Sequence, residues 1–80
     1  MKVNILAFGI ARDILGKSEA DVELQDGNTI EELKQLLLQK HPKFADLASL
    51  SFAVNEEYRK DDFHLSEGDE VVIIPPVSGG

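Results

Sequence analysis

Residues 65–80 read Leu-Ser-Glu-Gly-Asp-Glu-Val-Val-Ile-Ile-Pro-Pro-Val-Ser-Gly-Gly and contain the strongest strand signal in the chain. Four β-branched residues in a row predict an extended strand at Glu70–Ile74. Side chains alternate between the two faces of a strand, so the polar Glu70 marks the outer face, and Val71 and Ile73 should enter the core. Proline cannot donate a hydrogen bond to a sheet ladder, so the strand should end before the proline pair at 75–76.

The segments upstream of this strand predict an α+β domain. The clearest helix has Thr29 and Glu32 at the spacing of a capping box, and Pro42 should end it. Before this helix we expect a strand at 2–8 with Val3, Ile5 and Ala7 in the core, one or two helical turns at 10–15 stopped by Gly16, and a strand at 18–24. After it we expect an irregular stretch anchored by Phe44, Leu47 and Leu50, and then a short strand at 52–54. A polar turn at 55–57 and an ambiguous segment at 58–63 lead to the strand at 70–74. A single main helix on one face of a mixed sheet predicts a β-grasp roll, with the first and last strands as central neighbours.

Length and composition limit what the chain can be. Its 80 residues allow one small domain, predicted as 1–80 with 75–80 as an extended tail. It has no cysteine, which excludes disulfides, cysteine zinc sites and a thiol nucleophile. The net charge of −7 and pI near 4.6 argue against a direct nucleic-acid partner or an anionic membrane. The apolar runs are too short to span a bilayer, so we expect a soluble, cytoplasmic protein.

Side chains that could form an internal active site are sparse. The two histidines, His41 and His64, lie far apart in polar contexts, without the spacing of a metal-binding pair. The acidic clusters lack the pattern of a calcium loop, and the glycines lack the spacing of a phosphate loop. We therefore expect no resident metal, no bound cofactor and no catalysis by the isolated chain.

The C-terminal residues, unlike these side chains, could carry a reactive group. Proline fixes φ, so Pro75 and Pro76 should project the tail as a stiff stalk. Gly79 and Gly80 lack a Cβ, so they can pass through a narrow channel and allow close approach to the backbone. The Gly80 carboxylate is a poor electrophile, but conversion to an acyl-adenylate with ATP would let a sulfur atom attack and leave a thiocarboxylate. A frayed glycine end is the alternative reading.

An apolar sheet face is expected opposite the helix. Strand alternation places Leu6, Phe8, Val72 and Ile74 on that face. A small soluble domain rarely exposes such a patch without a partner. The alternative is that the 44–65 segment covers it.

Several motifs together resemble the family of molybdopterin synthase small subunits, the sulfur carriers of molybdenum-cofactor biosynthesis. The resemblance covers essentially the whole chain. It is carried by Val3–Phe8, Ala11–Gly16, Ala53–Asn55 and, most specifically, Leu65–Gly80. Sulfur carriers of thiamine synthesis share the Gly-Asp pair and the Gly-Gly end but typically lack the Pro-Pro-Val-Ser segment.

The resemblance implies a reaction sequence that uses the tail. An ATP-dependent enzyme, similar to ubiquitin-activating enzymes, would adenylate Gly80, and sulfur from a cysteine-desulfurase-type persulfide would form a thiocarboxylate. The tail would then enter the large subunit of molybdopterin synthase. There it would give sulfur to cyclic pyranopterin monophosphate, building the dithiolene in two transfers. The implied assembly is a heterotetramer of two small and two large subunits.

The resemblance also implies contact residues and leaves alternatives open. It places interface contacts at Phe8, Arg12, Tyr58 and Ile74, and it places Pro75, Pro76, Val77 and Ser78 beside Gly79 and Gly80 in the partner's active site. A carrier for thiamine synthesis or tRNA thiolation would share the chemistry. A ubiquitin-like modifier would instead join Gly80 to lysines of target proteins, and a plain interaction module would have an inert end.

Overall fold

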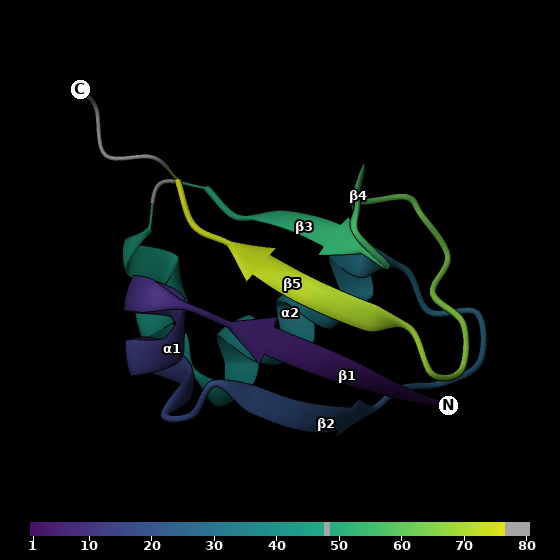
Figure 1. Ribbon diagram of the computed structural model, residues 1–80, viewed down its shortest axis with the longest axis horizontal. Helices are drawn as coiled ribbons and strands as arrows, with labels where there is room; N and C mark the ends of the chain where they lie inside the picture. The colour runs from purple at the N-terminus through teal and green to yellow at the C-terminus, as the bar shows by residue number, and fades with distance from the viewer. Residues whose placement is uncertain (48, 77–80) are drawn as a thin grey trace.

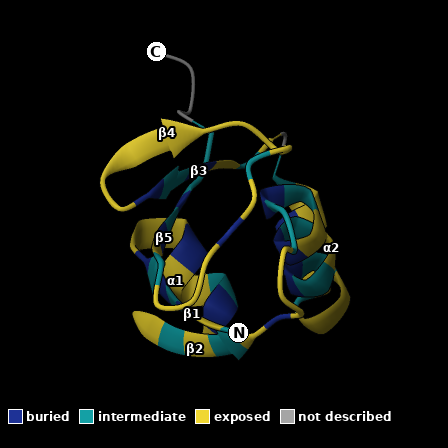
Figure 2. Ribbon diagram, turned by 90° about the vertical axis from the view of Figure 1, so that its right-hand side faces the viewer, coloured by how far each residue is buried: buried dark blue, intermediate teal, exposed yellow. Residues whose placement is uncertain are grey.

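The computed structural model describes residues 1–47 and 49–76 as a five-stranded sheet with its longest helix on one face and a shorter helix at one end (Figures 1 and 2). Its elements are β1 (Lys2–Ala7), α1 (Gly9–Leu15), β2 (Glu19–Glu23), α2 (Ile30–Lys40), the 3-10 helix η1 (Pro42–Asp46), β3 (Ser51–Val54), β4 (Glu57–Arg59) and β5 (Glu70–Ile74). The strand order is β2-β1-β5-β3-β4, with β1 and β5 parallel and the other pairs antiparallel. The predicted β-grasp roll is confirmed, including β1 and β5 as neighbours.

The core lies between this sheet and α2. Strand residues of one parity are buried, as the alternation predicted, and they meet the buried side of α2. The buried strand residues are Val3, Ile5, Ala7, Phe52, Val54, Val71 and Ile73, and those of α2 are Ile30, Leu33 and Leu37. Phe44 of η1 is 1% exposed and closes the core below α2. Burial of this apolar surface is the main favourable term in folding.

The N-terminus of α2 is held by side chains and by the 61–65 loop. The Glu32 N–H donates to Thr29 Oγ1 at 3.4 Å, and the Thr29 N–H donates to Glu32 Oε1 at 2.9 Å, which confirms the capping box. The N–H groups of Ile30 and Glu31 donate to the carbonyls of Phe63 and Asp61. These four bonds satisfy helix-end donors that would otherwise lack partners.

An ion pair fastens the same loop to the exposed side of α2. Lys34 Nζ lies 2.8 Å from Asp61 Oδ2 and 3.5 Å from Glu31 Oε2. The hydrogen bond from Lys34 to Asp61 raises the pKa of Lys34 above its usual value, although partial burial opposes this. The pair joins two segments 27 residues apart in sequence.

Several boundaries differ from the sequence expectation. The helical turns expected at 10–15 are confirmed as α1, which begins one residue earlier, and the irregular stretch expected around Phe44 contains the 3-10 helix η1. The first strand ends at Ala7, and Phe8 is the N-cap of α1 with φ −132° and ψ 159°. Glu57 belongs to β4 and not to the turn, since Asn55 and Glu56 alone supply the two positive φ angles of the hairpin, 50° and 74°. The ambiguous 58–63 segment contributes Tyr58 and Arg59 to β4.

Other expectations agree with the structure. Gly16 stops α1 with φ 86°, a backbone conformation that glycine adopts without steric cost. No helix in the described ranges is long and apolar enough to cross a membrane.

Candidate partner-binding face and C-terminal segment

On one side of the sheet no helix of the described residues packs, and we call this side the open face. Strand register puts Leu6 of β1, Val72 of β5, Ala53 of β3 and Tyr58 of β4 in one row across this face. The first three are half-buried, whereas Tyr58 is 73% exposed. Residues directly opposite on paired strands share a face, so this row is an apolar band with a phenol at one end and, opposite Leu6 on β2, the Glu19 carboxylate at the other.

The end of the open face nearest the C-terminus carries the most exposed aromatic side chain besides Tyr58. Phe8 and Ile74 each lie one residue beyond the paired Ala7 and Ile73. Phe8 is 61% exposed, and Ile74 is half-buried opposite Ser51. Phe8 is the N-cap of α1 and keeps an extended backbone, so it continues the line of β1 beyond the end of the strand.

The described residues of the 44–65 segment do not cover this face, although β3 and β4 form part of it. Its large apolar residues belong to the core cluster on the helix side: Phe44, Phe52, Val54 and Leu65 are buried, and Leu47, Leu50 and Phe63 pack against them. The expected exposed patch is nevertheless smaller than predicted. Leu6, Val72 and Ile74 are only half-exposed, because side chains packed along neighbouring strands cover one another's flanks.

The opposite end of the open face is polar and ordered by two asparagines. Asn4 Nδ2 donates to Glu19 Oε1 at 3.0 Å and to Asp21 Oδ1 at 3.1 Å. Asn55 Nδ2 donates to Asp69 Oδ1 at 2.9 Å, and Asn55 Oδ1 accepts from the Glu70 N–H. The open face therefore changes from acidic and polar at one end to apolar at the end from which the C-terminal segment departs.

Arg12 lies on α1, one helical turn after Phe8. Its backbone N–H reaches the Phe8 carbonyl at 3.3 Å, and its residue is exposed. A guanidinium here could add hydrogen bonds at the margin of an interface that includes Phe8. Ile10, which is 48% exposed on the same helix, was not among the residues predicted to lie at an interface. Ile10 and Ile14 are both apolar residues of this helix, and their spacing in the sequence did not show that Ile14 packs against the core whereas Ile10 is exposed.

The described part of the C-terminal segment is short. Pro75 and Pro76 follow β5 directly, are half-buried and form no regular element. The predicted functional residues Val77, Ser78, Gly79 and Gly80 lie outside the described residues. Within residues 1–47 and 49–76, no group of three or more His, Asp or Glu side chains is placed to hold a metal ion.

This topology and this face define a class of protein. A mixed sheet that wraps one long helix, with parallel first and last strands in its middle, is the ubiquitin-like β-grasp fold. The last strand ends at the apolar end of the open face, where Pro75 and Pro76 follow it.

Comparison with known proteins identifies the family. The profile of the ThiS family matches residues 5–80, and the chain belongs to that family. It is 39% identical over 83 residues to the molybdopterin synthase sulfur carrier subunit of Chlamydomonas reinhardtii, with all of both chains covered.

Two solved structures agree with this assignment. One is a Pyrococcus furiosus protein assigned to molybdopterin converting factor subunit 1, at 30% identity and TM-score 0.88, covering 96% of this chain and 99% of that one. The other is a complex of subunits 1 and 2 of the molybdopterin-converting factor from Helicobacter pylori, at 26% identity and TM-score 0.69, with both chains fully covered.

Proposed function

We propose that this chain is the sulfur-carrier small subunit of a molybdopterin synthase. The observation that carries the proposal is similarity over the full length of both chains to a protein of that name. The fold adds physical support, because an uncovered apolar face lies next to the segment that ends in Pro-Pro-Val-Ser-Gly-Gly.

The proposed chemistry takes place at Gly80. A partner enzyme uses ATP to convert the Gly80 carboxylate into an acyl-adenylate and releases pyrophosphate. The outer sulfur of a cysteine-desulfurase-type persulfide displaces AMP and forms an acyl disulfide with Gly80. A second thiol on the donor side then attacks the donor cysteine sulfur, so a disulfide forms there, the S–S bond to the acyl group breaks and a thiocarboxylate is left on Gly80. The chain itself needs no bound cofactor, since ATP is consumed by the activating enzyme, and alone it catalyses nothing. We place these steps in the cytoplasm, where ATP is supplied.

The proposed acceptor is bound to the large subunit of the synthase. Phe8, Tyr58 and Ile74 on the open face, with Arg12 at its margin, would contact that subunit. Residues 75–78 would carry Gly79 and Gly80 into its active site, where sulfur passes to cyclic pyranopterin monophosphate. The H. pylori structure, a complex of subunits 1 and 2, supports a partner of this kind. Two carriers on a dimer of large subunits would give the heterotetramer.

A reconstituted reaction tests the proposal. The thiocarboxylated chain, the large subunit and cyclic pyranopterin monophosphate are mixed, and the pterin is followed by mass spectrometry. We expect a product with two added sulfur atoms, and none with the unmodified chain. A thiocarboxylate that sulfurates only a thiamine or tRNA acceptor would assign the chain to another pathway. Lysine conjugates as the main product would make it a protein modifier.

A further inference from the structure

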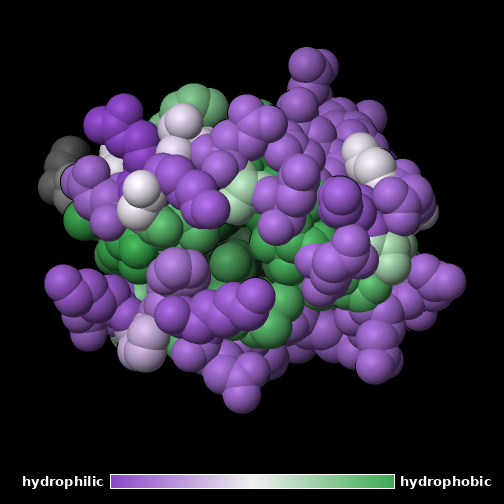
Figure 3. All heavy atoms as spheres, turned by 90° about the horizontal axis from the view of Figure 1, so that it is seen from below, coloured by the Kyte–Doolittle hydropathy of each residue, from purple (hydrophilic) through white to green (hydrophobic). Residues whose placement is uncertain are grey.

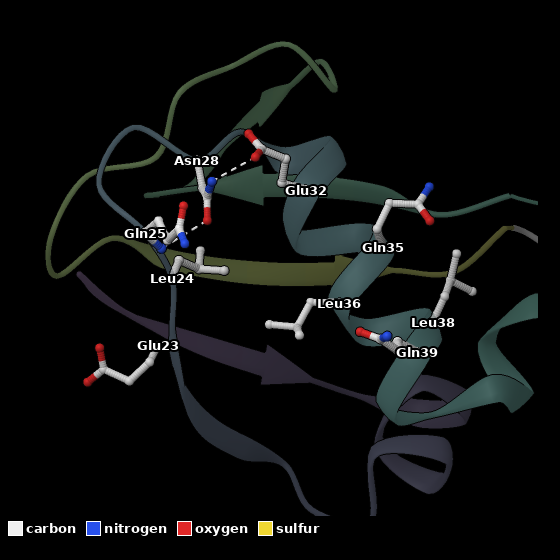
Figure 4. Close-up of a pocket in the computed structure, with 9 residues that line it drawn as sticks. All are labelled: Glu23, Leu24, Gln25, Asn28, Glu32, Gln35, Leu36, Leu38 and Gln39. Carbon is white, nitrogen blue, oxygen red and sulfur yellow. Dashed lines mark hydrogen bonds between the residues drawn. The ribbon is translucent and has the colours of Figure 1, made fainter.

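A groove separates the β2 edge of the sheet from α2, on the helix side of the molecule. Seen from the β2 side, apolar side chains gather in a hollow with hydrophilic side chains around it (Figure 3). The hollow has a volume of about 710 Å³, and Leu24, Leu36 and Leu38 are its apolar lining. Leu24 and Leu36 point toward one another across it (Figure 4). The other six of its nine lining residues are polar, so the free space suits an aliphatic side chain only where Leu24 and Leu36 line it.

The β2 strand beside the groove is an edge with outward-facing backbone groups. Leu24 and the Met1 amino group each donate to the other residue's carbonyl, and the Ala7 N–H donates to the Ser18 carbonyl. Antiparallel pairing alternates, so the even-numbered residues of β2 bond to β1. The N–H and C=O groups of Glu19, Asp21 and Glu23 therefore point away from the sheet. Among the described residues none pairs with them.

The acidic side chains along this edge favour a basic partner. The three residues with outward backbone groups, Glu19, Asp21 and Glu23, are all acidic, and Glu32 stands on the α2 side of the groove. Asn4 donates to Glu19 and Asp21 and so holds two of these carboxylates in place. A second copy of this chain, with net charge −7, would bring like charges against them. A basic strand would meet opposite charges at the same positions.

We propose that the β2 edge and the groove bind an extended, basic segment of another protein as an added strand. The segment's backbone would pair with Glu19, Asp21 and Glu23. Side chains alternate along a strand, so lysines or arginines would face the three carboxylates. The intervening aliphatic side chains would enter the groove over Leu24 and Leu36. Main-chain pairing supplies affinity in this mode of recognition, and the alternate side chains supply specificity.

This docking site does not use the residues proposed to bind the large subunit. The groove lies on the α2 side, and the carboxylates of the docking site line the β2 edge of the open face. Tyr58 and Ile74 lie on β4 and β5, and Phe8 follows the end of β1, so none of them is part of the docking site. The segment could therefore be bound while the C-terminal tail is engaged elsewhere. Its test is independent of sulfur transfer, because it needs neither a thiocarboxylate nor the large subunit.

The experiment titrates the full chain with a capped seven-residue peptide of alternating lysine and valine. Binding is followed by peptide fluorescence anisotropy and by amide and methyl NMR shifts. We expect saturable shifts centred on Glu19, Asp21, Glu23 and the methyl groups of Leu36. A matched peptide with glutamate in place of lysine should bind at least about tenfold more weakly. Added salt should weaken the binding of the basic peptide. Equal binding of both peptides would overturn the charge argument.

Two substitutions at one position separate backbone pairing from charge. Asp21→Pro removes an outward N–H and leaves the β1 ladder intact, a position where an edge strand tolerates proline. Asp21→Asn removes the same charge and keeps the N–H. We expect Asp21→Pro to reduce affinity at least about fivefold below Asp21→Asn. Equal affinities in two folded variants would mean charge attraction alone and would overturn strand addition.

A groove variant keeps the test decisive if Asp21→Pro does not fold. Leu36 is half-buried on α2, and lysine is also a good helix former, so Leu36→Lys should fold. It places a cation where the peptide's aliphatic side chains should enter, and it should weaken peptide binding at least about fivefold. Unchanged affinity of folded Leu36→Lys would overturn the proposal.

Discussion

Replacing Phe8 by alanine is expected to separate binding from folding. Phe8 caps α1 through its extended backbone and makes no side-chain capping hydrogen bond. Its side chain is 61% exposed at the apolar end of the open face. Alanine keeps the backbone N–H and removes the ring, so the loss should fall mainly on whatever covers that ring in the complex.

The exposed fraction of Phe8 determines how much binding free energy the substitution should remove. A fully covered aromatic side chain buries about 150–250 Å², so covering the 61% that is free removes roughly 90–150 Å² from water. At about 25 cal/mol per Å² this contributes roughly 2–4 kcal/mol to binding, or roughly 30-fold to several hundred-fold in the dissociation constant. The smaller share already covered in the free chain limits the loss of folding stability to roughly 1–2 kcal/mol.

Calorimetric titration with the large subunit, paired with thermal unfolding, measures both effects. Phe44→Leu is the matched control, because Phe44 is 1% exposed and lies in the core, on the helix side of the sheet and away from the open face. It should cost up to about 1.5 kcal/mol of stability and leave the dissociation constant unchanged. Normal binding of Phe8→Ala with a sharply lowered Tm would refute the reasoning, since it would mean that the ring serves the fold.

Three further predictions concern the tail and α2. Deleting Gly80 should abolish sulfur transfer and leave the Tm unchanged, because a terminal glycine has no side chain to bury; a large fall in Tm would mean that Gly80 contributes to folding stability. Thr29→Ala should lower the free energy of unfolding by about 1 kcal/mol through loss of the cap; an unchanged urea midpoint would contradict the role of the capping box. Lys34→Gln should cost about 0.5–1 kcal/mol at neutral pH. Because the folded-state pKa of Lys34 is raised, this difference should be present below its unfolded value of 10.5 and vanish as pH rises through the folded value; a difference that persists at the highest pH would exclude the ion pair as its cause.

Alternation and capping signals explain why most of the fold could be predicted. Val71 and Ile73 entered the core as their parity required, and the Thr29–Glu32 spacing located the start of α2. β4 could not be read in the same way. All three of its residues are exposed, so no burial pattern marks it. Its turn also places Glu56 at φ 74°, a conformation that glutamate rarely adopts and does not signal.

The candidate site shows the same division between local and tertiary information. Parity alone put Ile74 on the open face, and Phe8 left the strand but directly follows Ala7, the partner of Ile73. The position of Tyr58 depends on the β3–β4 register, which the sequence left undetermined. The groove beside β2 also needed the structure, because Leu24 and Leu36 each fit an ordinary core pattern in sequence. Only the packing of α2 against the sheet leaves a hollow between them.

Intact mass measurement after incubation with the activating enzyme, ATP and a sulfur donor tests the central claim most directly. The account predicts exchange of one oxygen for one sulfur, localised to Gly80 by fragmentation, with no exchange when ATP is omitted. An unchanged mass in the presence of an activating enzyme that sulfurates a related carrier would contradict it and would make the chain an interaction module with an inert end.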